Sequence, residues 1–147
     1  LDGIVGYYGE QLVLLAQSLG LNSCWVGGTY KVVNRAYNVD LGQKLAAVVA
    51  LGYGASQGVP HRSKAPQEVA PGYDGAPEWF KRGVDAALLA PTALNQQKFS
   101  FSLDGEENDV PVVRASTKRG AFTQMDLGIA QCHFEIGAGN VLYRWSE

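Results

Sequence analysis

A polar segment, the elbow (residues 90–97, APTALNQQ), directly follows the amphipathic stretch 77–89. Its proline ends the helix pattern, and the alternation that follows is typical of a strand. Within the elbow, the side chains of Thr92, Asn95 and Gln96 can form hydrogen bonds with the carbonyls and nitrogens of a planar, polar ligand. The same side chains could instead cap the end of the preceding helix.

Two further segments could contact such a ligand. A cationic loop comprises His61, Arg62, Ser63 and Lys64. Its two permanent cations and its hydroxyl could hold a phosphate group, although a solvated surface cluster would have the same composition. A second segment, Gly27-Gly28, has no Cβ atoms, so its backbone N–H groups could approach a flat ring closely. A plain turn at the end of a strand is the alternative.

The sequence offers no complete catalytic constellation of its own. It contains no Gly-Lys-Ser/Thr phosphate loop, no G-x-S-x-G element and no His-Glu-x-x-His zinc motif. Cys132 and His133 are neighbours on a predicted helix, where successive side chains point about 100° apart, so a nucleophile–base pair is not expected. His133 falls on the apolar stripe, which predicts a hydrogen-bonded histidine in the core or at an interface. Redox chemistry would therefore have to come from a cofactor, and no metal site is predicted.

The composition is that of an ordinary globular protein. A chain of 147 residues with 46% hydrophobic and 18% charged residues predicts a single domain. The net charge of −2 gives no reason to expect nucleic acid or an anionic membrane as a partner. No apolar stretch approaches the roughly 20 residues of a membrane span, and no signal peptide is visible. Cys24 and Cys132 lie in apolar patterns, which predicts two buried, reduced thiols in a cytoplasmic protein.

The first half of the chain predicts one helix and two strands. Apolar residues from Ile4 to Leu19 recur at helical spacing, and further apolar residues on the other faces predict a helix that is buried nearly all round. Gly20 is expected to end this helix in a left-handed conformation. Residues 23–26 predict a short strand. The continuous apolar run 45–53 predicts a strand in the middle of a sheet, covered on both faces. A long loop, residues 54–75, follows.

The second half predicts two helices and a hairpin. Pro77 is expected at the first position of a helix with an apolar inner stripe. Alternation at residues 99–103 predicts a strand that is buried on one face, with 110–115 as its hairpin partner. Asp126 is predicted to be the N-cap of a helix that ends near residues 137–139. Residues 141–145 predict a closing strand. The fold class is therefore α+β.

Several of these segments together resemble the FMN-dependent nitroreductases. Residues 9–25 resemble the long central helix and following strand of that family, and residues 45–54 with the cationic loop resemble its central strand and phosphate-contacting loop. Residues 90–99, the elbow with Lys98 and Phe99, resemble the flavin-edge element AP-S/T-x-x-N-x-Q-P-W. Residues 126–133, DLGIAQCH, are similar to the closing D-L-G-I-A-x-x-H helix of the Thermotoga-type branch, in which the elbow element comes after the central helix.

The resemblance implies a three-layer α+β sandwich, with a mostly antiparallel sheet flanked by helices. It also implies bound FMN, which passes electrons from NAD(P)H to a nitroaromatic, quinone or similar acceptor. The family's flavin lies at a dimer interface, so a homodimer is implied, with the helix 4–19 contributing. By the same resemblance, the cofactor contacts are Gly27 and Gly28 near the flavin N5, His61, Arg62, Ser63 and Lys64 at the phosphate, and Pro91, Thr92, Ala93, Asn95 and Gln96 at the ring or ribityl edge.

Two departures from the family pattern leave alternatives open. The family begins with an Arg-Arg-Ser-x-Arg segment that grips the phosphate; nothing like it is found here, so a fragment that lacks this segment is expected. Lys98 and Phe99 stand where proline and tryptophan usually follow the glutamine. A flavin-binding module without turnover is one alternative function. A structural or regulatory domain that has lost its cofactor is the other.

Overall fold

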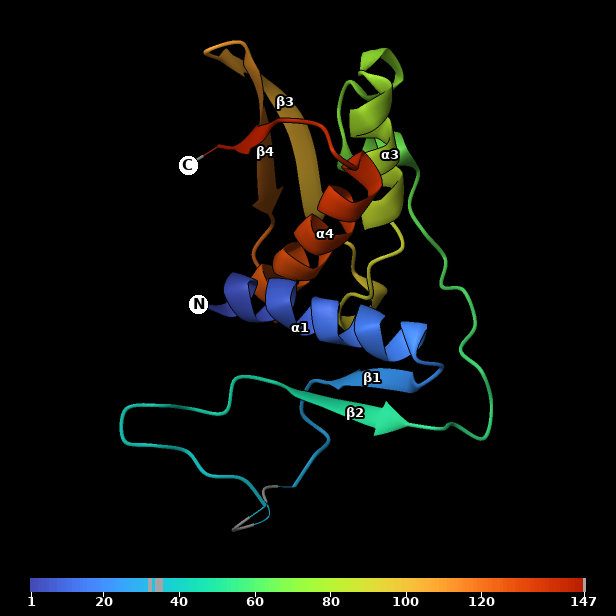
Figure 1. Ribbon diagram of the computed structural model, residues 1–147, viewed down its shortest axis with the longest axis vertical. Helices are drawn as coiled ribbons and strands as arrows, with labels where there is room; N and C mark the ends of the chain where they lie inside the picture. The colour runs from blue at the N-terminus through green and yellow to red at the C-terminus, as the bar shows by residue number, and fades with distance from the viewer. Residues whose placement is uncertain (32, 34–35, 147) are drawn as a thin grey trace. The chain divides into compact units, whose positions relative to one another are not determined.

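The computed structural model describes residues 1–31, 33 and 36–146. Its elements, in chain order, are α1 (Asp2–Ser18), β1 (Asn22–Val26), β2 (Val48–Gly52), α2 (Pro66–Val69), α3 (Glu78–Ala87), β3 (Phe99–Glu107), β4 (Val110–Thr117), α4 (Thr123–Ala138) and β5 (Arg144–Trp145) (Figure 1). The predicted α+β class is confirmed, with four α-helices and two small sheets in the described part of the chain. None of the described helices is long and apolar enough to cross a membrane.

The chain forms two compact units. One combines Leu1–Glu10 with Pro60–Glu147, and the other is Gln11–Val59. α1 therefore contributes its first half to the larger unit and its second half to the smaller one. The single domain expected from chain length remains a prediction.

In the smaller unit, β1 and β2 form an antiparallel pair, with Val26 opposite Val48. The strand predicted at residues 23–26 is confirmed. The prediction that the apolar run 45–53 is covered on both faces is wrong, because β2 belongs to a two-stranded sheet and Leu51 is exposed. An apolar run shows that a strand can be buried, but it does not specify which elements cover it. Cys24, predicted to be buried, is exposed for the same reason.

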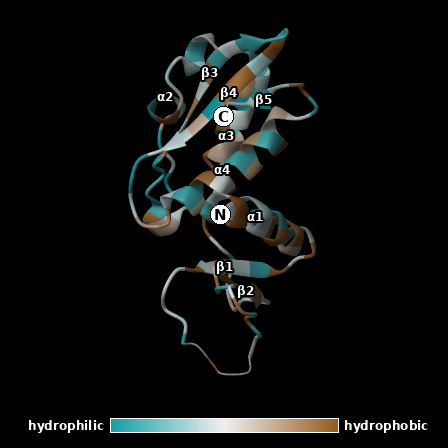
Figure 2. Ribbon diagram, turned by 90° about the vertical axis from the view of Figure 1, so that its left-hand side faces the viewer, coloured by the Kyte–Doolittle hydropathy of each residue, from teal (hydrophilic) through white to brown (hydrophobic). Residues whose placement is uncertain are grey.

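α1 forms as predicted, but its burial differs from the prediction. Its end is confirmed at Gly20, which has φ +77°, and Leu21 N–H donates to Ala16 O at 2.9 Å in the manner of a Schellman motif. The helix is not buried all round. Four large apolar side chains of α1 are more than half exposed, as is Leu19 directly after the helix; the four are Ile4, Tyr8, Leu12 and Leu15. Hydropathy colouring shows these apolar turns along α1 (Figure 2). The buried positions of α1 are instead Gly6, Glu10 and Ala16.

The larger unit has an aromatic core between its helices and its sheet. Phe80 of α3, Phe101 of β3 and Phe134 of α4 are at most 1% exposed, and the rings of Phe101 and Phe134 stack with centroids 4.8 Å apart. The predicted hairpin is confirmed as β3 and β4, which pair antiparallel. The closing strand is shorter than predicted, because β5 pairs with β4 only at Arg144 and Trp145.

Two helix boundaries in this unit differ from the predictions. Pro77 is the N-cap of α3 rather than its first residue. α4 begins at Thr123, after Phe122 in a left-handed conformation, so the prediction of Asp126 as N-cap is wrong. The aspartate lies in the first turn of α4 and its side chain bonds the elbow, as described below. Short helical turns, including α2, occur in the segment predicted as a loop.

Glycines bring α1 and α4 into backbone contact. A Cβ atom at Gly128 would lie 1.9 Å from Gly3 O, and one at Gly6 would lie 2.1 Å from Met125 O. Neither distance is possible for a real side chain, so only glycine permits this crossing. The first two turns of α1 are thereby fixed against the first turns of α4, next to the elbow.

Candidate functional site

The backbone of the elbow is strained. Leu94, Asn95 and Gln97 have φ values of +53°, +51° and +42°, in the left-handed region that costs a non-glycine residue about 1–2 kcal/mol. Such residues persist only where surrounding contacts hold them, and they cluster at functional sites. Contacts elsewhere in the fold must therefore offset the conformational free-energy cost of the elbow's backbone.

Gln97 is the side chain that holds the elbow to the cationic loop. It is 2% exposed, and its Nε2 donates to Arg62 O at 2.9 Å and to Asn95 Oδ1 at 2.7 Å. Its Oε1 accepts from Lys64 N–H at 2.9 Å, while Lys64 Nζ donates to Gln97 O at 2.6 Å. Asn95 Nδ2 adds a further bond to Arg62 O at 2.9 Å. The two segments, some thirty residues apart in sequence, thus form one hydrogen-bonded structure.

Asp126 fastens the other side of the elbow to α4. Its two carboxylate oxygens accept from Ala93 N–H at 2.9 Å and from Gln96 Nε2 at 2.7 Å. The same Gln96 nitrogen donates to Ala121 O at 2.9 Å. Burial raises the pKa of Asp126, while these two hydrogen bonds and the charge of Lys98 act in the opposite direction. The carboxylate is 4% exposed, and it is an anchor for the elbow rather than a group offered to solvent.

The cationic loop also caps the end of α3. Ser63 Oγ donates to Leu88 O at 3.0 Å, and His61 Nε2 lies 3.4 Å from Leu89 O. The other ring nitrogen, His61 Nδ1, is buried and has no hydrogen-bond partner among the described residues. Arg62 is exposed, and the bonds described for it involve its carbonyl. Hydrogen bonds therefore hold the loop to α3 and to the elbow, and they leave the exposed guanidinium of Arg62 and the buried Nδ1 of His61 without a described partner.

The structure brings together two of the three segments predicted to form a site. The side chains of Asn95 and Gln96, predicted to bond a ring, are engaged within the elbow and with its neighbours. Thr92 Oγ1 accepts from Gln97 N–H at 3.1 Å, and Pro91 is half-buried beside it. Gly27 and Gly28 are exposed and belong to the other unit, so their place beside a flavin remains a prediction.

Gln97 was not among the residues predicted for the site, and Asp126 was predicted as a helix N-cap rather than as an anchor of the elbow. The signal for Gln97 was present, because a glutamine between a polar turn and a strand must satisfy its amide wherever the strand becomes buried. The capping of α3, considered for Thr92, Asn95 and Gln96, is done by Ser63 and His61 instead.

His133 confirms the prediction of a hydrogen-bonded core histidine. Its Nε2 lies 2.8 Å from Glu10 Oε1 of α1; the glutamate side chain is 1% exposed and the histidine side chain 12%. Its neighbour Cys132 is buried as well, and burial raises the pKa of that thiol to about 11, which makes it a poor nucleophile. Among the described residues, no three histidine, cysteine or carboxylate side chains gather to hold a metal ion.

The fold of this protein is nitroreductase-like. It resembles the crystal structure of a putative nitroreductase from Thermotoga maritima, with a TM-score of 0.66 and 22% sequence identity. The match covers 90% of this chain and 52% of that one, so the chain spans about half the length of its structural relative. The model of the family described as "Putative TM nitroreductase" matches residues 1–138, and the chain belongs to this family. No curated protein matches the sequence.

Of the side chains in the cationic loop, Arg62 has the exposure and charge that suit a phosphate such as that of FMN. The exposed Arg62 can give charge-assisted bonds to a phosphate, whereas the orphaned His61 Nδ1 is buried within the protein. The amides of the elbow fit less directly, because their hydrogen-bonding groups are engaged within the protein.

Proposed function

We propose that this chain supplies the flavin-binding elbow of an FMN-dependent oxidoreductase. The observation that carries the proposal is the joining of the cationic loop to the strained elbow through Gln97. Membership in the nitroreductase family supports it. Bound FMN would supply hydride acceptance from NAD(P)H and electron transfer to a nitroaromatic, quinone or similar acceptor.

In this proposal, each residue of the loop and the elbow binds or positions. In this proposal Arg62 holds the phosphate. His61, Ser63 and the Lys64 ammonium fix the loop through the carbonyls of Leu89, Leu88 and Gln97, respectively. Lys64 is thus proposed as a positioning residue rather than a phosphate ligand, because its Nζ already donates within the protein.

The elbow has the corresponding role at the ring. Asn95 and Gln96 hold the left-handed backbone, so that the chain near Pro91, Thr92 and Ala93 can face the ring or ribityl edge. Gly27 and Gly28 are proposed near the flavin N5. The protein orients the ring and excludes water, and none of its side chains is required as an acid or base.

A homodimer is part of the proposal. Soluble monomers rarely expose a large continuous apolar patch. Three leucines in the second half of α1 and directly after it, Leu12, Leu15 and Leu19, are each more than half exposed. A second copy covering these leucines would remove that surface from water. Substitution of Leu12 by lysine should shift the sedimentation coefficient toward that of a monomer, whereas Gln17→Lys, on an exposed polar position, should not.

A second candidate function is a domain of the same fold that works without a cofactor. The engagement of Thr92, Asn95 and Gln96 in internal hydrogen bonds favours it, since the elbow then serves stability alone.

Flavin titration and turnover separate the two candidates. The oxidoreductase should quench FMN fluorescence saturably, bleach its flavin absorbance on addition of NADH or NADPH, and oxidise the nicotinamide faster when menadione or nitrofurazone is present. Flavin that binds but never bleaches would indicate a binding module without turnover. No saturable binding would leave the cofactor-less domain.

A further inference from the structure

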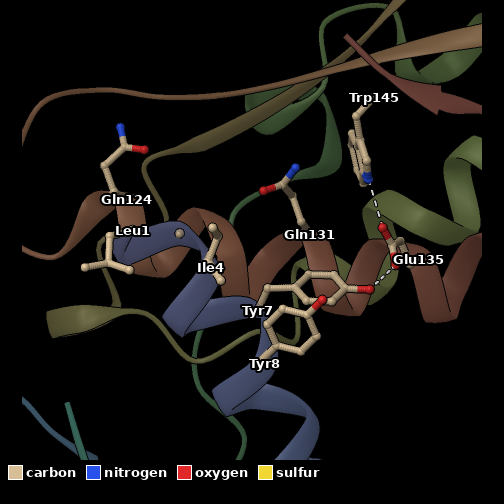
Figure 3. A pocket seen from close by; sticks show the side chains of 9 residues that line it. Leu1, Ile4, Tyr7, Tyr8, Gln124, Gln131, Glu135 and Trp145 are labelled. Atoms are coloured by element: carbon tan, nitrogen blue, oxygen red, sulfur yellow. Dashed lines mark hydrogen bonds between the residues drawn. The ribbon is translucent and has the colours of Figure 1, made fainter. Parts of the chain in front are cut away.

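Glu135, on α4, is a half-buried carboxylate that accepts hydrogen bonds from two aromatic side chains. Trp145 Nε1 donates to Oε1 at 2.8 Å, and the Tyr7 hydroxyl donates to Oε2 (Figure 3). Both donors are neutral. No cationic side chain in the described part of the chain forms an ion pair with Glu135. Its negative charge is therefore stabilised by dipoles but not neutralised.

A pocket of about 440 Å³ opens beside this carboxylate. It is lined by Leu1, Gly3, Ile4, Tyr7, Tyr8, Gln124, Gln131, Glu135 and Trp145. In Figure 3, the rings of Tyr7 and Tyr8 lie below Glu135 and the indole of Trp145 lies above it. All of these residues belong to the larger unit. The pocket is separate from the contacts that join the loop and the elbow.

Aromatic rings surround the carboxylate on more than one side. Tyr7 and Tyr8 meet edge to face with centroids 5.2 Å apart, and Tyr143 and Trp145 do so at 5.4 Å. A second hollow of about 380 Å³ is lined by Glu135, Tyr143 and Trp145 together with Gly139. Burial, with the charge of Glu135 adding to it, raises the pKa of Tyr143, which is the effect expected of a negative field in this region.

We propose that this pocket binds a small organic cation, an alkylammonium group on a short apolar body. The cation would take the place of the missing counter-ion at Glu135, beside the aromatic rings of Tyr8 and Trp145 that line the pocket. Its apolar body would lie against Leu1 and Ile4, at the other end of the pocket. The inference is independent of the flavin function, because it uses none of the residues of the loop or the elbow.

Charge selects this ligand class over the alternatives. An anionic or nitro-bearing aromatic would place oxygen atoms against an uncompensated carboxylate, which is repulsive in a half-buried site. A neutral aromatic could stack on the rings, but it would gain nothing from Glu135. A cation gains from both the carboxylate and the ring quadrupoles.

A matched pair of ligands tests the proposal on the full chain. Choline and its neutral carbon analogue, 3,3-dimethylbutan-1-ol, have nearly the same shape and differ in charge. Each would be titrated while the Trp145 indole N–H is followed in ¹H–¹⁵N spectra, with that resonance assigned by Trp145→Phe. We expect saturable shifts with choline and at least about tenfold weaker binding of the alcohol. Equal affinities, or no saturable shift with choline, would overturn the proposal.

Two variants locate the binding energy. Glu135→Gln keeps the shape of the side chain and should abolish the preference for choline. Tyr8→Leu keeps an apolar contact at a position that is 62% exposed, and it should weaken choline binding several-fold without affecting folding. Glu78→Gln, an exposed carboxylate on α3, is the control and should bind choline like the wild type. If Glu135→Gln fails to fold, Tyr8→Leu decides, since wild-type affinity in that variant would contradict the proposal.

Discussion

Replacing Asp126 by alanine removes the acceptor that joins α4 to the elbow. Two donors lose their partner: Ala93 N–H, 2.9 Å from one carboxylate oxygen, and Gln96 Nε2, 2.7 Å from the other. Hydrogen bonds to a charged group contribute about 1.5–3 kcal/mol each, or about 3–6 kcal/mol for the pair. Two effects reduce this figure. Gln96 keeps its bond to Ala121 O, and the variant no longer has to bury a carboxylate.

We therefore expect Asp126→Ala to lower the free energy of unfolding by about 2–4 kcal/mol. Urea unfolding at pH 7, followed by circular dichroism, would measure this directly. The matched control is Asp104→Ala, which removes an exposed carboxylate paired with Arg114 and should cost at most about 1 kcal/mol. Equal losses in the two variants would refute the anchoring role of Asp126. Hydrogen exchange should also accelerate at residues 93–97 in Asp126→Ala and remain unchanged there in Asp104→Ala.

Three further predictions concern α1 and α4. Gly128→Ala should lower the free energy of unfolding by about 1–3 kcal/mol in thermal unfolding, because the added Cβ would overlap Gly3 O. Gly28→Ala, with open space around the added Cβ, should change it by less. Similar losses in the two variants would exclude the close crossing of α1 and α4. A double-mutant cycle of Glu10→Gln and His133→Gln should give a coupling free energy above about 0.5 kcal/mol, and strict additivity would mean that the buried contact contributes nothing. The pKa of Asp126 is raised in the folded state, so the folded protein binds this proton at a higher pH than the unfolded chain does. The free energy of unfolding of the wild type, relative to that of Asp126→Asn, should therefore increase from pH 7 toward pH 4 and level off below the ordinary pKa of 3.8. A decrease over that range would contradict a carboxylate whose pKa is raised by burial.

Local patterns predicted the elements well because their causes are local. The alternation of Phe99 and Phe101 follows from the two faces of β3, and the end of α1 at Gly20 follows from the ease with which glycine adopts positive φ. The start of α4 was harder. Asp126 has the side chain of a good N-cap, but the structure uses it for a tertiary contact and starts the helix three residues earlier, at Thr123. The preference of aspartate for N-cap positions does not show when a tertiary hydrogen bond will use the same side chain.

The apolar pattern of α1 did not predict which element packs against each face of the helix. Helical spacing identified the stripe of Ile4 and Tyr8, yet the close backbone contact with α4 is made by Gly3 and Gly6, which carry no hydrophobic signal. Close packing through glycine depends on which backbone lies opposite. That information lies elsewhere in the chain.

The meeting of the cationic loop and the elbow was predicted better than the hydrogen bonds that their side chains make. The cationic loop and the elbow were expected to meet, and they do so through Gln97, whose role depends on the burial of the segment between the turn and β3. Asn95 and Gln96 were expected to face a ligand, but left-handed residues in the elbow need internal donors and acceptors to hold them. The strain itself could not be foreseen from residue types such as leucine and glutamine.

The most direct test of the account is the affinity of FMN for two arginine variants. Removing the guanidinium of Arg62 deletes at least one charge-assisted bond to phosphate, so Arg62→Ala should raise the dissociation constant about ten- to a hundredfold. Arg114→Ala removes an exposed arginine that pairs with Asp104, and it should bind FMN like the wild type. Fluorescence titration of FMN into the three proteins gives the comparison. An Arg62→Ala variant that binds FMN as tightly as Arg114→Ala would contradict the placement of the cofactor at the cationic loop.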